Sequence, residues 1–346
     1  MAEINRSGGQ DDNRGIAGSG LTPDLLLKVA GFSAAPGAAR SAERRKIHAN
    51  ILKRIDFSDA VTEKTQSRLE RGYKKVITKL LKKGSSPDLS ELEDAVGEMV
   101  CGADAEAGIP AKICGMKDHS GYMYSHSIRC GVIAGQVAAS LSYSEDDARS
   151  FATAMILHDV GMLAIPEEIL NKRTQTPQDL AELRKHPELG FELLKKIPDI
   201  DLLSSIVAYS HHAQADGKGY PAGIDMNELP AIARLAPVID NFEALTAERA
   251  RGDAASPHEA ARELMDNAGR YHPAALDSFL RAVGVFPVNT FVKLNTGEVG
   301  VVVRNNQENL LLPTVKLLMD PVGKPYAREI IADMMNEDGR EIASEV

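Results

Sequence analysis

The sequence predicts a mainly α-helical protein with a small β-rich domain at its C-terminal end. Apolar residues recur at three- and four-residue spacing in stretches before Pro287. Aromatic residues make up only 5% of the 346 residues and Trp is absent, so Leu, Ile, Val, Met and Ala must fill the core. After Pro287 the pattern changes to short β-branched runs around a turn that contains Gly297.

The N-terminal third divides into a polar tail and a helical region. Residues 1–22 are rich in Gly, Ser, Asn and Asp and offer few apolar side chains, so we expect a disordered tail. Residues 23–117 are expected to be helical, with one helix over 58–83 and a shorter one over 89–100.

The middle region, residues 118–286, is expected to hold consecutive helices joined by short loops. Ser144 and Asp147 have capping-box spacing and predict the start of a helix over 145–158. Thr176 followed by Pro177 predicts another helix start.

The last region, residues 287–346, is expected to form a small β-rich domain docked on the helices, because about 55 residues are marginal alone. Its expected hairpin covers 291–304, and runs at 314–318 and 328–332 are candidate further strands.

Composition limits the class of protein and its partners. The formal net charge of −9 argues against nucleic acid as a partner. Three cysteines without CxxC spacing indicate free thiols in a reducing compartment. The start of the chain lacks a signal-peptide pattern, and no run of about 18 apolar residues offers a membrane span. We therefore expect a cytoplasmic protein without a membrane partner.

Histidines and aspartates at helix ends carry the chemical signal. Any one of them alone fits an ordinary core or surface residue, but their concentration in one stretch indicates a metal site. Imidazole and carboxylate ligands suit Fe, Mn or Zn rather than Mg or Ca. The absence of thiolates argues against a structural zinc site. The candidate metal ligands are His126, His158, Asp159, His186, His211, His212 and Asp240.

These residues and their neighbours closely resemble the HD-GYP family, a branch of the HD-domain phosphohydrolases. The resemblance covers about 118–283, and the small domain after 287 is similar to one that accompanies some members. The matching segments are Tyr124-Ser125-His126-Ser127, His158-Asp159-Val160-Gly161, the stretch 165–172, His186-Pro187-Glu188-Leu189-Gly190, His211-His212, the stretch 216–223 and Ile239-Asp240-Asn241-Phe242-Glu243-Ala244-Leu245.

The resemblance implies a helical HD-domain bundle around a metal centre that hydrolyses cyclic di-GMP to the linear dinucleotide or GMP with a metal-activated hydroxide. It implies two divalent metal ions, with Fe or Mn favoured, bridged by Asp159, and a catalytic role for His158 and Asp159. Arg249, Lys172 and Tyr220 are the implied substrate contacts. The loop Gly219-Tyr220-Pro221 is a candidate surface for a protein partner, and a homodimer stays open.

The chain also departs from the family pattern. Met162 replaces a usual Lys, Ala213 a usual Glu and Gly252 a second basic residue, although Arg251 is adjacent. Tyr122 replaces the Glu of three-metal members, which favours a two-metal site. Met162 keeps open a catalytically weak cyclic di-GMP receptor or protein-interaction module. A third reading, a phosphohydrolase acting on other nucleotides, fits the intact Gly219-Tyr220-Pro221 loop less well.

Overall fold

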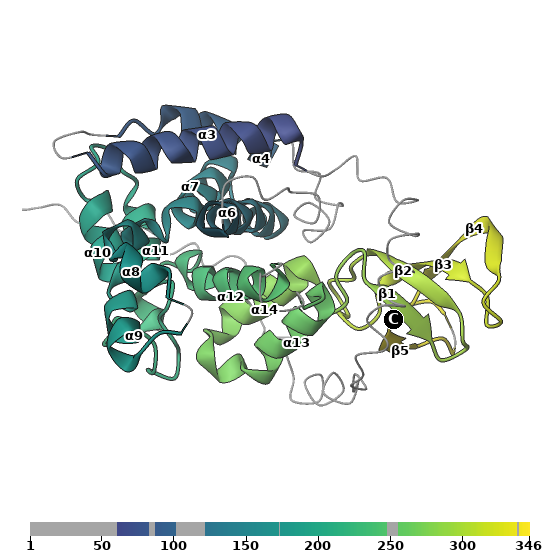
Figure 1. The fold of residues 1–346 in the computed structure, drawn as a ribbon. Helices are drawn as coiled ribbons and strands as arrows, with labels where there is room; N and C mark the ends of the chain where they lie inside the picture. Colours follow the sequence, from purple (N-terminus) through teal and green to yellow (C-terminus); the bar gives the residue numbers. More distant parts are fainter. Residues whose placement is uncertain (1–60, 83–86, 102–121, 173, 248–254, 338) are drawn as a thin grey trace, which may run out of the picture.

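The computed structural model describes residues 61–82, 87–101, 122–172, 174–247, 255–337 and 339–346 (Figure 1). The predicted tail at 1–22 and parts of the predicted N-terminal region lie outside the described residues. Within the described part no helix is long and apolar enough to cross a membrane.

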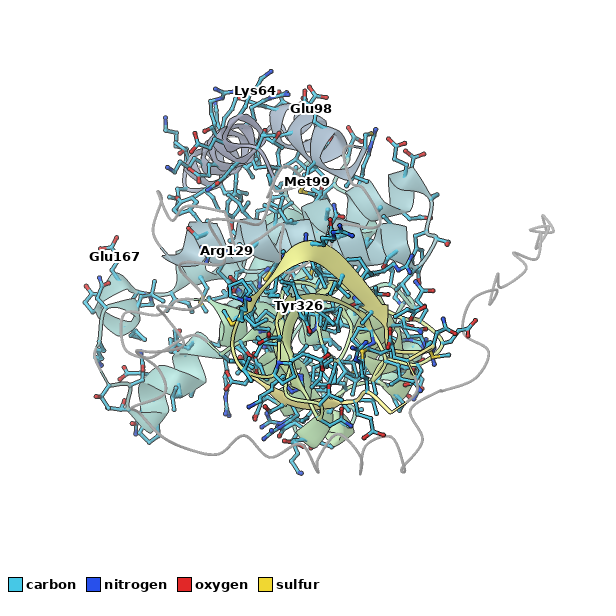
Figure 2. The ribbon with its side chains drawn as sticks, turned by 90° about the vertical axis from the view of Figure 1, so that its right-hand side faces the viewer. Lys64, Glu98, Met99, Arg129, Glu167 and Tyr326 are labelled. Carbon is cyan, nitrogen blue, oxygen red and sulfur yellow. The ribbon has the colours of Figure 1, made fainter. Side chains whose placement is uncertain are left out.

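Two N-terminal helices form one outer layer. Helix α3 (Glu63–Leu80) and helix α4 (Ser90–Cys101) pack together over the central helices, as Figure 1 shows. In Figure 2, Lys64 and Glu98 project from the outer side of this pair and Met99 lies on its inner side. Both helices are predicted by the sequence, and their apolar stripes explain why they pack on the bundle.

The central bundle is a series of helices joined by short loops, as predicted. Ser144 Oγ accepts the Asp147 N–H at 3.1 Å and caps the helix that begins at Glu145. A reciprocal capping box at Thr176 starts the helix that begins at Pro177. The helices are α6 (Tyr122–Ser140), α7 (Glu145–Leu157), η1 (Val160–Ala164), α8 (Glu167–Leu170), α9 (Pro177–Leu183), α10 (His186–Leu194), α11 (Leu202–Ser210), η2 (Met226–Glu228), η3 (Ala233–Leu235), α12 (Ala236–Thr246), α13 (Pro257–Asp266), η4 (Ala268–Arg270) and α14 (Pro273–Val283).

A close backbone approach joins η1 to α10. A Cβ built on Gly161 would lie 1.9 Å from the carbonyl oxygen of His186 and 2.5 Å from the nitrogen of Gly190. Only glycine at position 161 permits this packing, because any side chain would collide with rigid backbone. The approach holds the residues after α7 against the start of α10.

The C-terminal region is a five-stranded antiparallel sheet with the order β4-β3-β2-β1-β5. The predicted hairpin and the two predicted further strands are confirmed, and a fifth strand went unpredicted. It is short and pairs with the distant first strand, so its partner is not visible locally. The strands are β1 (Phe291–Leu294), β2 (Val299–Arg304), β3 (Thr314–Met319), β4 (Pro325–Asp333) and β5 (Ile342–Glu345).

The sheet is docked on the helices, as predicted. Arg281 Nη1 on α14 donates to the carbonyl of Gln307 at 2.8 Å, and Asn305 Nδ2 donates to the carbonyl of Val283 at 2.6 Å. Phe286 is buried in the same apolar cluster as Val302 of the sheet. One continuous core therefore runs from the helices into the sheet, and Figure 1 shows the sheet beside α13 and α14.

Candidate metal centre

All seven predicted ligands come together inside the bundle, delivered by five separate parts of the chain. His126 lies on α6 and Asp240 on α12. His158 and Asp159 follow the end of α7, and His186 begins α10. His211 and His212 follow α11. Helix ends dominate because neighbouring residues there escape the roughly 100° separation that an uninterrupted helix imposes.

Asp159 lies between two pairs of histidines. Its Oδ2 is 3.6 Å from His158 Nε2 and 3.9 Å from His126 Nε2. Its Oδ1 is 3.3 Å from His186 Nε2 and 3.6 Å from His211 Nε2. Each carboxylate oxygen thus faces a different pair of imidazoles.

Asp240, on helix α12, also lies close to several of the histidines. Its Oδ1 lies 3.1 Å from His126 Nε2 and 3.7 Å from His158 Nε2. Its Oδ2 lies 3.7 Å from His212 Nδ1. Only 11% of the Asp240 side chain and 14% of the Asp159 side chain are exposed, so both carboxylates face imidazoles rather than bulk water.

Backbone carbonyls orient three of the imidazoles. His158 Nδ1 donates to the carbonyl of Met155 at 2.6 Å, and His186 Nδ1 donates to the carbonyl of Leu183 at 2.7 Å. His211 Nδ1 lies 3.0 Å from the carbonyl of Ala208. Because a carbonyl only accepts hydrogen bonds, each Nδ1 carries the proton and each Nε2 offers its lone pair inward.

The inward nitrogen atoms fit a cation. The Nε2 atoms of His186 and His211 are 3.0 Å apart, and two lone pairs at that distance need a positive charge between or beside them. The Nε2 of His158 is buried without a hydrogen-bond partner among the described residues. Within this cluster, sets of three or four donor atoms lie within 4.8 Å of one another. The donor set therefore fits divalent metal binding.

The protonation states of both carboxylates and of two imidazoles also favour a metal, whereas, against the effect of burial, neighbouring acidic groups raise the pKa of His126 and of His158. Burial alone would raise the pKa of Asp159 and of Asp240, but the surrounding imidazoles hold both well below the usual value. Burial, together with His211, lowers the pKa of His186 to about 4 and that of His212 to about 2. Ionised carboxylates and neutral imidazoles are the forms that bind metal ions.

Sequence reasoning missed Glu243, which is completely buried beside the centre. Its Oε2 forms a short contact with His126 Nδ1, and its Oε1 lies 3.6 Å from Arg129 Nη1. Its spacing could have revealed it, because Glu243 follows Asp240 by three residues and therefore lies on the same face of the helix. A carboxylate that accepts from Nδ1 directs the Nε2 of His126 towards Asp240.

Cys130 is the second missed neighbour. Its Sγ lies 3.8 Å from both ring nitrogens of His126, one helical turn earlier. Burial raises the pKa of the Cys130 thiol to about 12, so it is a neutral group beside the imidazole. It adds a sulfur atom to one side of a cluster otherwise made of nitrogen and oxygen.

The three predicted substrate contacts have different surroundings. The Tyr220 ring lies 4.5 Å from the His212 ring, beside the centre. Lys172 Nζ is engaged by Asp179 at 2.6 Å. Arg249 lies outside the described residues, as do Arg251 and Gly252.

The signature loop folds back on the histidine pair. The Tyr220 N–H donates to the carbonyl of His212 at 3.1 Å, and a Cβ on Gly219 would lie 2.4 Å from that carbonyl. A glycine at 219 is therefore required for the loop to reach His212. The Arg184 guanidinium lies over the Tyr220 ring, 5.5 Å from its centroid, in an arrangement that sequence reasoning did not anticipate.

Two family models match the chain. One, described as an HD domain, matches residues 115–275, and another, described as a KOW domain associated with HD domain, matches residues 291–346. Fold and centre together define a helical HD-domain protein with a candidate metal site.

Known relatives refine this class. The cyclic di-GMP phosphodiesterase PA4108 of Pseudomonas aeruginosa is 28% identical over 250 residues, which cover 72% of this chain and 60% of that protein. The 3'3'-cGAMP-specific phosphodiesterase 2 of Vibrio cholerae is 31% identical over 45% of this chain and 30% of its own length.

The solved structure of Bd1817, an HDG"Y"P protein from Bdellovibrio bacteriovorus, matches with a TM-score of 0.51 and 18% identity. The match covers 62% of this chain and 69% of that one and supports the fold. The chain belongs to the HD-GYP family.

Proposed function

We propose that this protein is a metal-dependent phosphodiesterase that hydrolyses cyclic di-GMP to the linear dinucleotide or GMP. One observation supports it most strongly. The two oxygens of Asp159 face two different pairs of histidines inside a buried cluster. This is the arrangement expected of a carboxylate that bridges two cations. The substrate class comes from the relatives, whose names specify cyclic dinucleotides.

The proposed ligands divide into two sets that Asp159 joins. His126, His158 and Asp240 would hold one divalent ion, and His186, His211 and His212 the other. When bound, two such ions clamp a phosphodiester and supply a nucleophile from water near neutral pH. Iron or manganese suits this mixture of imidazole and carboxylate donors.

The chain's own residues keep this site rigid. Carbonyl acceptors fix three imidazoles and Glu243 fixes a fourth, so little reorganisation is needed when ligands bind. Because Asp159 and Asp240 are mostly buried, their charges act on bound groups with little screening by water.

Tyr220 is the proposed substrate contact with the best placement, because its ring flanks His212. Arg184, held over the same ring, is a cation that can approach a substrate phosphate. Arg184 would thereby partly compensate for the positive charge that is lost where Met162 replaces the usual lysine. Arg249 and Lys172 remain proposed contacts; for Lys172 this requires release from Asp179.

Product analysis tests the proposal. Iron- or manganese-loaded protein is incubated anaerobically with cyclic di-GMP, with Asp159→Asn as the control that keeps side-chain size and removes the charge. We expect metal-dependent formation of linear dinucleotide or GMP that is lost in the variant. A parallel incubation with 3'3'-cGAMP tests the substrate choice.

A second candidate function rests on Met162, which lies in η1 one turn after the His158-Asp159 pair. Without a lysine there, the protein would act as a cyclic di-GMP receptor or protein-interaction module. Metal-loaded protein that binds cyclic di-GMP tightly and leaves it intact would favour this candidate and reject the phosphodiesterase. Partner binding through the Gly219-Tyr220-Pro221 loop, and homodimer formation, belong to the same proposal.

A further inference from the structure

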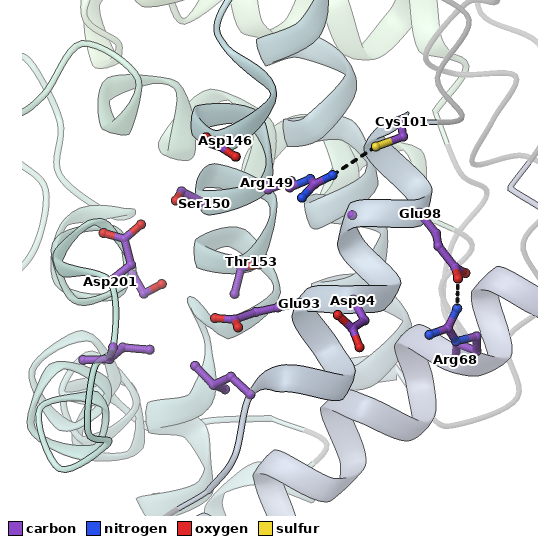
Figure 3. A pocket seen from close by; sticks show the side chains of 14 residues that line it. Arg68, Glu93, Asp94, Glu98, Cys101, Asp146, Arg149, Ser150, Thr153 and Asp201 are labelled. Atoms are coloured by element: carbon purple, nitrogen blue, oxygen red, sulfur yellow. Dashed lines mark hydrogen bonds and ion pairs between the residues drawn. The ribbon is translucent and has the colours of Figure 1, made fainter.

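A second cavity lies where the N-terminal layer meets the central bundle. Its volume is about 630 Å³, and its lining comes from α3, α4, α7 and the start of α11 (Figure 3). None of the seven candidate metal ligands lines it. The volume is in the range of small-molecule sites in proteins.

The lining of this cavity has an excess of acidic groups. Arg68 pairs with Glu98, and Arg149 Nη2 contacts Cys101 Sγ at 3.1 Å and pairs with Glu145. Both arginines are therefore paired with carboxylates, although the buried Nε of Arg149 has no hydrogen-bond partner among the described residues. Four lining carboxylates have no cationic partner among the described residues, namely Glu93, Asp94, Asp146 and Asp201.

The carboxylates come from opposite walls. In Figure 3, Glu93 projects from α4 into the space between that helix and Asp201. The pKa of Glu93 is raised, mainly by its partial burial and to a smaller extent by the nearby charges of Asp88, Asp94 and Asp201. A positive ligand between the walls would remove this repulsion.

Ser204 supplies an independent sign of a ligand. It lines the cavity and is completely buried, yet its Oγ has no hydrogen-bond partner among the described residues. A helical serine usually satisfies its hydroxyl with a carbonyl of the preceding turn. A buried hydroxyl without a partner is destabilising, and a ligand that donates or accepts a hydrogen bond would remove that cost.

The spacing of the acids points to an organic cation rather than a metal ion. In the described part of the chain, donor atoms close enough to share one ion occur in the histidine cluster, and none of the cavity carboxylates belongs to such a group. Leu89 and Ile200 add apolar surface to the lining. Separated charges in a lining that also has apolar surface match ammonium groups joined by methylene chains.

We propose that this cavity binds a small aliphatic diamine or polyamine, with ammonium groups at Glu93 and Asp201 and one N–H donated to Ser204 Oγ. Such a ligand would join α4 to α11, the helix whose C-terminal end leads into His211. Ser204 precedes His211 by seven residues, roughly 10 Å along the helix axis. Binding there would therefore influence the stability of the helix that carries His211.

Calorimetric titration of the full chain with spermidine tests the proposal without measuring metal content or hydrolysis. The test variant is Glu93→Gln/Asp201→Asn, in which Asn keeps the capping function at the start of α11. The matched control is Asp266→Asn/Glu308→Gln, which makes the same charge change at exposed positions away from the cavity lining. Ser204→Ala tests the hydroxyl, and Glu93→Gln alone serves if the double variant is unfolded.

We expect saturable binding at one site, weakened about tenfold by the double substitution and severalfold by Ser204→Ala. The control pair should bind like the parent chain. Equal weakening by the test and control pairs would show diffuse attraction to an acidic protein and overturn the proposal. Failure to saturate would overturn it too, as would Mg²⁺ binding at this site as tightly as spermidine.

Discussion

At their C-terminal ends, helices α7 and α11 lead into His158 and His211, which are completely buried and held by backbone carbonyls. At their N-terminal ends, the same two helices present Asp146 and Asp201, which are exposed and lack cationic partners among the described residues. The C-terminal end of each helix thus leads into a buried site whose imidazoles are held in place. The N-terminal end of each helix borders the open acidic cavity.

This difference separates two ways of binding positive charge. The buried end fixes each donor atom beforehand, so it suits a small ion with strict geometry. The exposed end leaves its carboxylates hydrated and separated, so it suits a flexible cation and should bind more weakly. Substitutions at the two ends should therefore have effects of very different size.

The largest effect is expected from Asp159→Asn. The substitution leaves side-chain volume nearly unchanged but removes the charge that faces four imidazoles. We expect most bound metal to be lost and the rate of hydrolysis to fall by about 100-fold or more. Metal analysis after dialysis and a kinetic assay measure the two effects. Full retention of metal would refute the assigned centre.

A smaller effect is expected from Glu243→Gln. The neutral amide oxygen is a weaker hydrogen-bond acceptor than the carboxylate, so the bond that orients His126 is weakened. Metal affinity should fall about 10- to 100-fold, as is typical for such supporting groups. Glu263→Gln, an exposed change on α13, is the matched control. Competition with a chelator measures both affinities, and equal values would exclude a positioning role for Glu243.

The sequence indicated the candidate metal ligands better than the groups that orient them. His-Asp and His-His pairs at helix ends are local patterns, and the family motifs added His126, His186 and Asp240, so all seven candidate ligands could be chosen without coordinates. Glu243 contacts a histidine 117 residues earlier, and Cys130 resembles any apolar helix residue. Such contacts depend on how the helices pack, which hydrophobic periodicity does not specify.

The fold shows the same limit. Capping residues predicted the starts of α7 and α9, because their hydrogen bonds are local. Strand β5 pairs with β1 across about 50 residues of sequence, so no local pattern announced it. The acidic cavity likewise combines α4 with α11, far apart in the chain.

Met162→Lys tests whether the missing cation limits catalysis. Met162 lies in η1 and is partly exposed, so a lysine can be accommodated without burying its charge. If the phosphodiesterase proposal holds, kcat should rise, by about tenfold for one added charge interaction with the reacting phosphate. Leu163→Lys, in the same turn with similar exposure, is the matched control. A rise in both variants would indicate a general electrostatic effect rather than a specific site.

The smallest effect is expected at the far end of α7, from Ser144→Ala. The substitution removes the hydroxyl that accepts the Asp147 N–H, which should lower the free energy of unfolding by about 1 kcal/mol. Denaturant unfolding of the metal-free chain measures this loss. Metal affinity should stay unchanged, because the packing of Gly161 against α10 fixes the residues after α7 independently of its first turn. A matching loss of metal affinity would instead show that the two ends of α7 are coupled, in which case a ligand in the acidic cavity would also act on the metal centre.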